Sequence, residues 1–266
     1  MATPRPLALV TGASAGIGLE LARLLAAGGH DLILVARRGD SLERLAAELR
    51  AAHGIVAHVW PVDLGDPQAP RQLQTRAAAE GLAVDVLVNN AGYGALGAFA
   101  DLPADRQLGI LDVNMRALTE LTHRFLPGMR ARRRGRILIV ASLAGFLPGP
   151  YMAVYYASKA YLLSFALALA DELAGSGVTV TCLCPGSTAT EFQAVAGMTA
   201  ARRLARLRPM TAGSVARIGY RGLMRGRRLV VAGWKNRLGA LAIRCVPRTA
   251  LSRVVAWLQR PDGGRQ

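Results

Sequence analysis

Residues 7–18 read LALVTGASAGIG, an apolar run that enters a glycine-rich turn, and a helical pattern follows over residues 19–27. Glycines in such a turn let the backbone approach a pyrophosphate, whose charge is met by the amides and the dipole at the helix N-terminus. The glycines are spaced Gly-x3-Gly-x-Gly instead of the more general Gly-x-Gly-x-x-Gly. The turn is therefore either a phosphate cradle or a plain tight turn, and as a cradle it would use Gly12, Ser14, Gly16, Ile17 and Gly18.

The rest of the chain repeats this alternation of short apolar runs and longer segments with apolar residues at spacings of three and four. Such an alternation is the sequence form of βαβ units around a parallel sheet. The expected strands are residues 7–11, 31–36, 56–62, 84–89, 136–141, 178–183 and 228–232. The expected helices are residues 16–28, 41–53, 67–80, 104–130, 153–174 and 213–225.

These elements predict an α/β fold in a single domain, a doubly wound parallel sheet of the Rossmann type with about seven strands and helices on both faces. A chain of 266 residues suffices for one such domain. We expect residues 1–233 to form the Rossmann-type catalytic and cofactor-binding domain, and residues 234–266 to form a C-terminal helical extension of it. The irregular stretch 187–209 falls where a substrate loop is expected in such a fold.

Composition narrows the class of protein. The net charge of +16 invites a nucleic-acid interpretation, but the arginines are dispersed, and neither a recognition motif nor alternating aromatic residues accompany them. We interpret no segment as a membrane span, and residues 1–6 hold no apolar secretory core, so we expect a cytoplasmic protein. The three cysteines lack metal-ligand spacing, and Cys182 and Cys184, inside an apolar run, are expected to be buried free thiols.

The second expected strand ends in Arg37 and Arg38, where a protein that binds NAD would usually place an acidic residue for the ribose 2′-hydroxyl. A guanidinium there pairs with a 2′-phosphate, which a carboxylate would repel. The sequence therefore predicts NADP(H) as the cofactor, with Arg37 as the first choice for the phosphate contact and Arg38 as the second. The alternative is a solvated charge that opens the next helix.

Tyr155 and Lys159 are four residues apart in an expected helix, so they project from one face about one turn apart. A nearby ammonium and the positive charge of an oxidised nicotinamide both favour the phenolate, which makes Tyr155 a candidate proton donor and acceptor. Ser142 ends the fifth expected strand, where a hydroxyl faces the ligand crevice and can orient a substrate oxygen. The alternative for Ser142 is a turn cap.

In this order and spacing the motifs resemble the short-chain dehydrogenase/reductase family, from residue 7 to about residue 233. The resemblance implies that Asn114 is a fourth catalytic residue, the alternative being a polar side chain satisfied inside its helix. It also implies that Lys159 holds the nicotinamide ribose. The other positions that the resemblance assigns to the cofactor site are Asp63 and Leu64 after the third strand, Asn90, Ala91 and Gly92 after the fourth, and Pro185, Gly186, Thr188 and Thr190 after the sixth.

The resemblance implies an oxidoreductase that moves a hydride between NADP(H) and a hydrophobic carbonyl or alcohol substrate, as a ketone or aldehyde reductase. An NAD-linked alcohol or hydroxy-lipid dehydrogenase and an NADP(H)-binding sensor without turnover stay open as alternatives. We expect a small-molecule substrate and a homo-oligomer, a dimer or a tetramer. We expect no nucleic acid as a partner, because the arginines are dispersed. We also expect no metal ion, because the four histidines show no ligand spacing.

Residues 234–260 exceed what closing the sheet requires. Two apolar series recur there at helical spacing on either side of Pro247, and six basic residues occur without an acidic one. Helices of this kind cap the substrate pocket, pack against a second subunit or lie in a membrane surface. Peripheral membrane contact is thus one hypothesis for this segment, and Trp234 and Trp257 are expected to cover apolar surface.

Overall fold

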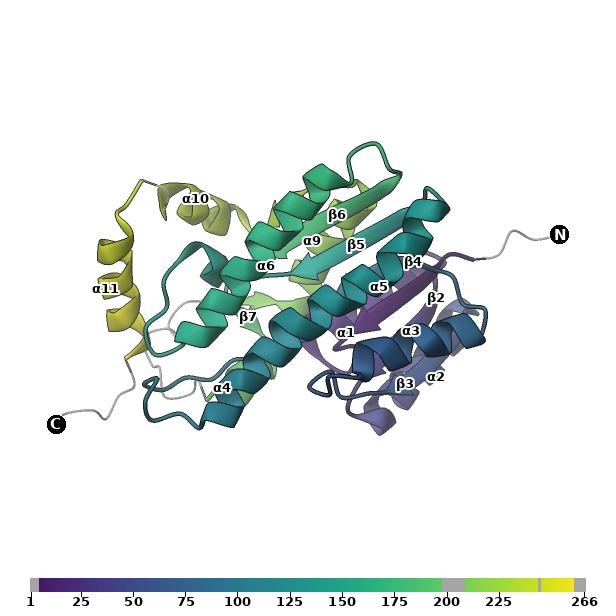
Figure 1. Cartoon of the computed structure of the whole chain (residues 1–266), viewed down its shortest axis with the longest axis horizontal. Coiled ribbons are helices and arrows are strands. Elements are labelled where there is room, and N and C mark those ends of the chain that lie inside the picture. Colours follow the sequence, from purple (N-terminus) through teal and green to yellow (C-terminus); the bar gives the residue numbers. More distant parts are fainter. Residues whose placement is uncertain (1–4, 198–208, 244, 261–266) are drawn as a thin grey trace.

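The computed structural model describes residues 5–197, 209–243 and 245–260. Its centre is a parallel sheet of seven strands in the order β3-β2-β1-β4-β5-β6-β9 (Figure 1). All seven strands lie where the sequence predicts them. They are β1 (Leu7–Thr11), β2 (Asp31–Ala36), β3 (Ala57–Pro61), β4 (Val84–Asn89), β5 (Gly135–Val140), β6 (Val178–Cys184) and β9 (Leu229–Val231).

The strand order reverses at β1, because β2 and β3 extend the sheet on one side of it and β4 pairs on the other. All five residues of β1 are buried, as expected of a strand that is covered on both faces. In open α/β sheets, ligands bind at the carboxyl ends of the strands where the order reverses. The fold therefore places the glycine-rich turn after β1 and the Asn-Asn-Ala-Gly segment after β4 at the expected ligand crevice.

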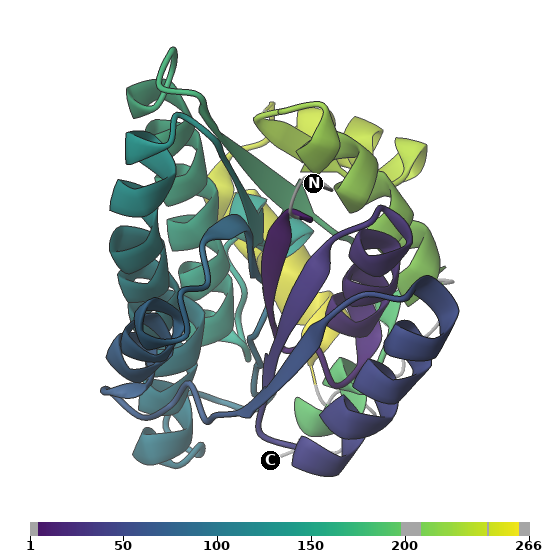
Figure 2. The same ribbon diagram turned by 90° about the vertical axis from the view of Figure 1, so that its right-hand side faces the viewer.

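Helices cover both faces of the sheet, and Figure 2 shows the sheet between these two layers. One apolar cluster joins α3, α5 and α6 to the sheet, and a second joins α1, α2 and α9 to its other face. The predicted doubly wound α/β architecture is thus confirmed. The helices are α1 (Gly16–Ala27), α2 (Gly39–His53), α3 (Ala69–Ala79), α4 (Ala104–Leu111), α5 (Leu118–Ala131), α6 (Ala153–Glu172) and α9 (Ala212–Met224).

The helix predicted over residues 104–130 is not a continuous α-helix. A π-helical segment, η1 (Asp112–Ala117), separates α4 from α5. Its wider turn directs Asn114, which is fully buried, toward the backbone of Tyr93 and the hydroxyl of Ser158. The apolar spacing predicted one uninterrupted helix, because spacings of three and four do not reveal the one inserted residue of a π-helical turn. Turns of this kind are frequent at functional sites.

The chain after β6 forms elements that the sequence left irregular. β7 (Thr188–Ala189) and β8 (Met210–Thr211) form a short parallel sheet, and the single helical turn α7 (Phe192–Val195) follows β7. Residues 198–208 of the predicted substrate loop lie outside the described residues. The described part of this loop therefore begins with an ordered strand and a helical turn beside the carboxyl end of β6.

Two helices follow β9, α10 (Trp234–Ile243) and α11 (Arg248–Gln259). The predicted separation at Pro247 is confirmed, since this residue precedes α11 as its N-cap. The expectation that Trp234 and Trp257 cover apolar surface is wrong, because their side chains are 69% and 60% exposed. Both helices turn one face to the protein and leave the other to solvent, so the tryptophans lie on the outer faces.

Among the described residues, one helix is long and apolar enough to cross a membrane by length and composition alone, and it is α6. Leu162, Ala166 and Leu169 of this helix belong to an apolar cluster with the sheet, and Lys159 is buried in it. A core helix of a soluble α/β domain has the same composition. We therefore interpret α6 as a core helix.

Candidate active site

The turn after β1 has a backbone that only glycine adopts without strain. Gly12 and Gly16 have φ angles of 65° and 57°, in the left-handed region. A Cβ atom at Gly12 would lie 2.7 Å from the side-chain nitrogen of Asn90, and one at Gly18 would collide with the carbonyl of Gly12. A Cβ at Gly16 would come within 3.0 Å of Thr190. The glycines therefore let the turn, the start of α1 and the segments around Asn90 and Thr190 pack closely together, as expected of a phosphate cradle.

The end of β1 is tied to the end of β4 by Thr11, which the sequence analysis did not single out. Its Oγ1 donates to Val88 O at 3.0 Å and accepts from the backbone nitrogens of Asn90 and Ala91 at 2.9 and 3.1 Å. The Asn90 Nδ2 donates to Thr11 O at 3.0 Å. These hydrogen bonds hold the segment around Asn90 against the glycine turn. The role of the Asn90 side chain in this structure is thus to position the backbone of that turn.

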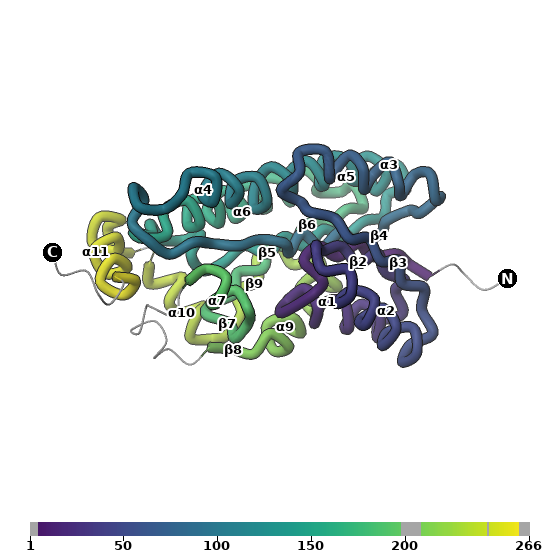
Figure 3. The backbone as a smooth tube through the Cα atoms, turned by 90° about the horizontal axis from the view of Figure 1, so that it is seen from below, coloured from purple at the N-terminus to yellow at the C-terminus, as the bar shows by residue number. Residues whose placement is uncertain are grey.

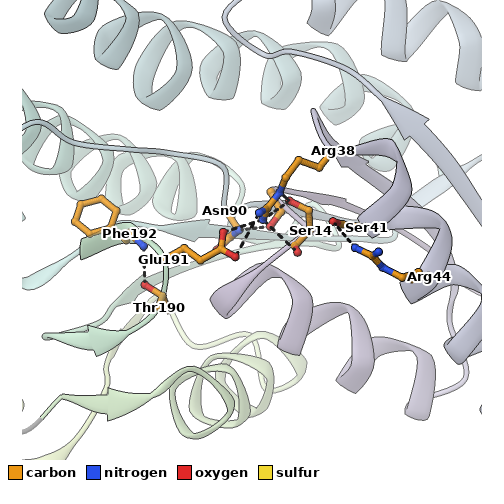
Figure 4. Close-up of polar contacts among 9 residues, drawn as sticks. Ser14, Arg38, Ser41, Arg44, Asn90, Thr190, Glu191 and Phe192 are labelled. Carbon is orange, nitrogen blue, oxygen red and sulfur yellow. Dashed lines mark hydrogen bonds and ion pairs between the residues drawn. The ribbon is translucent and has the colours of Figure 1, made fainter. Parts of the chain in front are cut away.

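Arg38 lies across the glycine turn and reaches the loop after β7 (Figure 4). Its Nη2 donates to Ser14 Oγ at 3.2 Å and forms an ion pair with Glu191 Oε2 at 2.8 Å. Arg37 is exposed at the end of β2, and its charge acts on the Tyr93 hydroxyl. The arginine ranked second in the sequence analysis is thus the one in contact with the cradle, and Glu191 is a partner that the sequence did not reveal.

Ser142 and Tyr155 meet beyond the carboxyl end of β5. The Ser142 Oγ accepts from Ala144 N at 3.1 Å and so caps the 3-10 turn η2 (Leu143–Phe146). The same hydroxyl lies close enough to Tyr155 to lower the pKa of the phenol. The cap and the contact to Tyr155 therefore coexist, and the two interpretations of Ser142 do not exclude each other.

Burial raises the pKa of Tyr155 well above its usual value, and the hydrogen bond from Ser142 only partly offsets this effect. The sequence analysis expected the ammonium of Lys159 to favour the phenolate. The Lys159 Nζ does lie 5.7 Å from the centre of the Tyr155 ring, but loss of hydration is the larger effect. Tyr155 is therefore a neutral phenol at pH 7 in this structure.

Lys159 is 5% exposed, and its Nζ donates to Val140 O at 2.9 Å. Burial lowers the pKa of this ammonium to about 8. Cys182 and Cys184 are both fully buried, as predicted, and their sulfur atoms lie 3.8 Å apart. Their electrostatic effect raises the pKa of Lys159 and so opposes the larger effect of burial. Lys159 is consequently held at the end of β5 by the hydrogen bond to Val140 O.

Asn114 organises the other side of this lysine. Its Oδ1 accepts from Tyr93 N and its Nδ2 donates to Tyr93 O, both at 3.0 Å, and the Nδ2 also donates to Ser158 Oγ at 3.0 Å. A Cβ at Gly92 would meet Asn114 Oδ1 at 2.9 Å and Lys159 Nζ at 3.6 Å. Asn114 is satisfied by groups outside its own helix, so it joins the segment after β4 to α6.

Phe192 and Gly94 close the space over Tyr155. The rings of Phe192 and Tyr155 have centres 5.2 Å apart, and a Cβ at Gly94 would lie within 3.2 Å of both side chains. A small pocket beside Tyr155 is lined mainly by apolar side chains, among them Phe99, Leu102 and Met152. The sequence analysis named none of these residues, because it had no pattern that relates them to the catalytic helix.

The remaining predicted residues follow the carboxyl ends of β1, β3 and β6. Asp63 is exposed after β3 and accepts from Gly65 N at 2.9 Å, whereas the Leu64 side chain is buried in the core. Pro185 O accepts from Leu143 N at 2.8 Å, and Thr188 Oγ1 donates to Gly186 O at 3.0 Å. Thr190 Oγ1 accepts from Phe192 N at 3.3 Å, and Ile17 is half-buried at the start of α1.

The C-terminal helices touch this site from outside. Gln259 of α11 donates to the hydroxyl of Tyr156, the neighbour of Tyr155. A Cβ at Gly186 would meet the side chain of Asn236 in α10 at 2.5 Å. Within residues 5–197, 209–243 and 245–260, no three His, Cys, Asp or Glu side chains gather in a group that could hold a metal ion.

A glycine cradle at the strand reversal, next to converging Ser, Tyr and Lys side chains, defines a dinucleotide-binding α/β protein with an acid-base site. The chain belongs to the short chain dehydrogenase family, whose model matches residues 6–201.

Relatives within the family are named as reductases and dehydrogenases. A very-long-chain 3-oxoacyl-CoA reductase from Phaeosphaeria nodorum is 38% identical over 180 residues, which are 66% of this chain and 53% of the relative. The chain spans about half the length of the first curated relatives that it matches.

Two solved structures extend the likeness along the chain. A short-chain dehydrogenase from Sphingobium yanoikuyae in complex with NADPH has a TM-score of 0.81 and 29% identity, and the match covers 98% of both chains. A 7beta-hydroxysteroid dehydrogenase has a TM-score of 0.84 and 25% identity, with 94% of this chain and 96% of that chain covered. The fold of the whole described chain is therefore that of the family.

Proposed function

We propose that the protein is an NADPH-dependent reductase of an apolar carbonyl compound. The observation that carries the proposal is the convergence of Ser142, Tyr155 and Lys159 at the carboxyl ends of the central strands, beside a glycine cradle. When bound, NADPH supplies a hydride to the carbonyl carbon. The Tyr155 hydroxyl donates a proton to the carbonyl oxygen, and Ser142 orients that oxygen by a hydrogen bond.

The protonation state of Tyr155 supports the direction of reduction. Reduction of a carbonyl needs an acid; a tyrosine is a neutral phenol at pH 7, and burial raises the pKa of Tyr155 and so further favours this form. Oxidation of an alcohol would need the phenolate, whose formation burial disfavours. Lys159 stabilises the negative charge that Tyr155 acquires once the proton has left.

An apolar substrate is supported by the side chains around Tyr155. Phe99, Leu102 and Met152 line the pocket, and Phe192 packs on the tyrosine ring. An apolar group of a substrate would gain by burial against these side chains, at about 25 cal/mol for each Å² removed from water. Because the Phaeosphaeria nodorum relative is named a very-long-chain 3-oxoacyl-CoA reductase, 3-oxoacyl thioesters are the first substrates to test.

The experiment that tests the proposal follows NADPH absorbance with a panel of ketones, aldehydes, steroids and 3-oxoacyl thioesters. Turnover that rises with the length of the apolar chain is the expected result. Faster oxidation of alcohols with NAD would instead establish the NAD-linked dehydrogenase. Tight NADPH binding without turnover of any compound in the panel would leave the sensor function in its place.

The native protein is expected to prefer NADPH over NADH by about tenfold to a hundredfold in kcat/KM, since charge-assisted contacts to a phosphate contribute about 1.5–3 kcal/mol. Arg37 and Arg38 both flank the crevice at the end of β2, and no acidic residue stands there. Arg37→Asp is expected to invert the preference, measured as kcat/KM with each cofactor. Equal efficiency of the native protein with both cofactors would show that neither arginine contacts the phosphate.

Glu191→Gln is expected to tighten NADPH binding about twofold to fivefold, because the carboxylate competes with the 2′-phosphate for Arg38. The ion pair is exposed, and pairs of this kind contribute about 0.2–1 kcal/mol. Calorimetry with NADPH and NADH measures the effect, which should be confined to NADPH. The control is Glu172→Gln, at the C-terminal end of α6, which removes a carboxylate charge away from Arg38. It should leave the affinities for NADPH and NADH unchanged. In an Arg38→Ala background the effect of Glu191→Gln should vanish, and persistence there contradicts the competition.

A further inference from the structure

Exposed apolar side chains gather on the two C-terminal helices. Of the eleven large apolar residues that are exposed in the described part of the chain, six lie between residues 234 and 257, although this segment is a small part of it. Figures 1 and 3 place α11 at the end of the molecule away from the N-terminus, with α10 beside it. Soluble proteins rarely concentrate apolar surface in this way unless another surface covers it.

The apolar residues of α10 form one row on its outer face. Trp234, Leu238 and Leu241 are spaced i, i+4 and i+7, so they lie on the same side of the helix, and all three are more than half exposed. The inner face holds Ala240, which is buried, and Asn236, which donates to Ala232 O at 2.6 Å. A helix on the surface of a soluble protein normally turns its apolar row toward the core. In α10 the row of Trp234, Leu238 and Leu241 faces the solvent instead.

α11 repeats the arrangement. Ala250, Val254 and Trp257 have the same i, i+4 and i+7 spacing and are exposed, while Val255 and Gln259 are buried against the protein. The contact between Gln259 and the Tyr156 hydroxyl fixes the inner face of the helix to α6. The orientation of the outer row is therefore set by contacts on the opposite side of the helix.

Basic side chains flank both rows. Lys235 and Arg237 lie beside the row of α10, with the Lys235 Nζ 5.6 Å from the centre of the Trp234 ring, and Arg253 lies beside the row of α11. All three are exposed, and residues 233–260 contain no Asp or Glu. An apolar row between positive charges is complementary to the surface of an anionic bilayer. The apolar side chains would contact the acyl chains, and the basic side chains would contact the negative headgroups.

We propose that the outer faces of α10 and α11, the C-terminal face, bind the surface of an anionic lipid membrane. The face comprises Trp234, Leu238, Leu241, Val254 and Trp257 with Lys235, Arg237 and Arg253. Charge distinguishes a membrane from a second copy of the chain as the occupant. In a two-fold dimer this face would meet itself, which would bring positive groups together without a carboxylate between them.

Membrane binding of this kind would place the active site next to the lipid, because the inner side chains of the same helices contact Tyr156 and Gly186. The inference does not rest on the proposed reaction. Its test measures binding, and a failure of either proposal leaves the other standing.

The experiment is cosedimentation of the intact chain with vesicles of phosphatidylcholine and with vesicles that also contain phosphatidylserine. Binding to the anionic vesicles is expected at about 0.1 M salt and loss of binding at about 1 M, where the screening length falls from about 10 Å to about 3 Å. Leu238→Gln with Leu241→Gln should lower the partition coefficient at least tenfold, as should Arg237→Glu with Arg253→Glu. The matched controls are Leu108→Gln, an exposed leucine of α4, and Arg44→Glu with Arg71→Glu, exposed arginines of α2 and α3.

Circular dichroism and NADPH binding establish that each variant is folded, since none of the substituted residues lies in the active site. Equal binding of the variants and their controls would overturn the proposal, as would failure of the intact chain to bind anionic vesicles at the lower salt. Light scattering measures the oligomeric state and so tests whether a second copy of the chain covers the C-terminal face. A dimer that Leu238→Gln with Leu241→Gln dissociates, without vesicle binding by the native chain, would assign the C-terminal face to a second copy and likewise overturn the proposal.

Discussion

Tyr155→Phe is expected to lower turnover by at least about 10²-fold and to leave the affinity for NADPH nearly unchanged. The substitution deletes one hydroxyl and keeps the ring that packs against Phe192 at 5.2 Å between ring centres. The nearby Ser142 hydroxyl does not replace it as the proton donor, because an aliphatic hydroxyl is a much weaker acid than a phenol. Steady-state kinetics with the best substrate of the panel, together with calorimetry for NADPH, measure the two effects.

Tyr156→Phe is the matched control for this prediction. Tyr156 is the next residue on α6, and its hydroxyl accepts from Gln259 instead of facing Ser142. Burial raises the pKa of Tyr156 to about 12, so it too is a neutral phenol at pH 7. We expect its removal to change turnover less than threefold. If Tyr155→Phe retained activity within threefold, or if Tyr156→Phe were the more damaging of the two, the assignment of the proton donor would be wrong.

Lys159→Met is expected to abolish most activity and at the same time to stabilise the fold. Turnover should fall at least about 10²-fold, and the Kd for NADPH should rise about tenfold to a hundredfold, as expected for the loss of a hydrogen bond from a charged group. The gain in stability arises because the ammonium is 5% exposed, and Val140 O accepts from it. Replacing it by an apolar side chain of similar length removes the cost of burying the charge.

The pH dependence of this gain follows from the lowered pKa. Burial lowers the pKa of Lys159 to about 8 from the ordinary lysine value of 10.5, so between these values the unfolded chain binds more protons than the folded one. The stability of the native protein therefore rises with pH across this window, and the full cost of the buried ammonium is present below pH 8. Lys159→Met should be more stable below pH 8 by on the order of 1–3 kcal/mol, and the difference should shrink toward pH 10.

Denaturant unfolding of both proteins from pH 6 to about 10 measures this difference. Lys235→Met is the control, since Lys235 is the only other lysine of the chain and is exposed. It should change neither turnover nor the pH dependence of stability. A Lys159→Met protein that is less stable than the native one at pH 7 would show that the ammonium is fully compensated by its surroundings.

The sequence alone was sufficient for the fold and for most of the candidate site. Seven apolar runs, separated by helical patterns, predict the parallel sheet because strands covered on both faces are nearly continuous in apolar residues. Gly12 and Gly16 were recognisable from the Gly-x3-Gly-x-Gly spacing directly after an apolar run, and the structure adds that both have positive φ angles. Tyr155 and Lys159 were recognisable because four residues in a helix bring two side chains to one face. Each of these inferences concerns residues that are close in sequence, where backbone geometry alone relates them.

Only the tertiary structure decided the contacts between distant segments. Arg38 and Glu191 are 153 residues apart, and Tyr156 and Gln259 are 103 apart, so no local pattern relates either pair. The π-helical turn at Asn114 depends on partners that come from the segment after β4 and from α6.

The C-terminal helices illustrate the same limit. Helical spacing predicts that α10 has an apolar face, but it does not say whether that face meets the core or the solvent. The structure places Leu238 and Leu241 outward because Asn236 and Ala240 occupy the inner side, and which side packs is decided by the surface that the folded chain already presents.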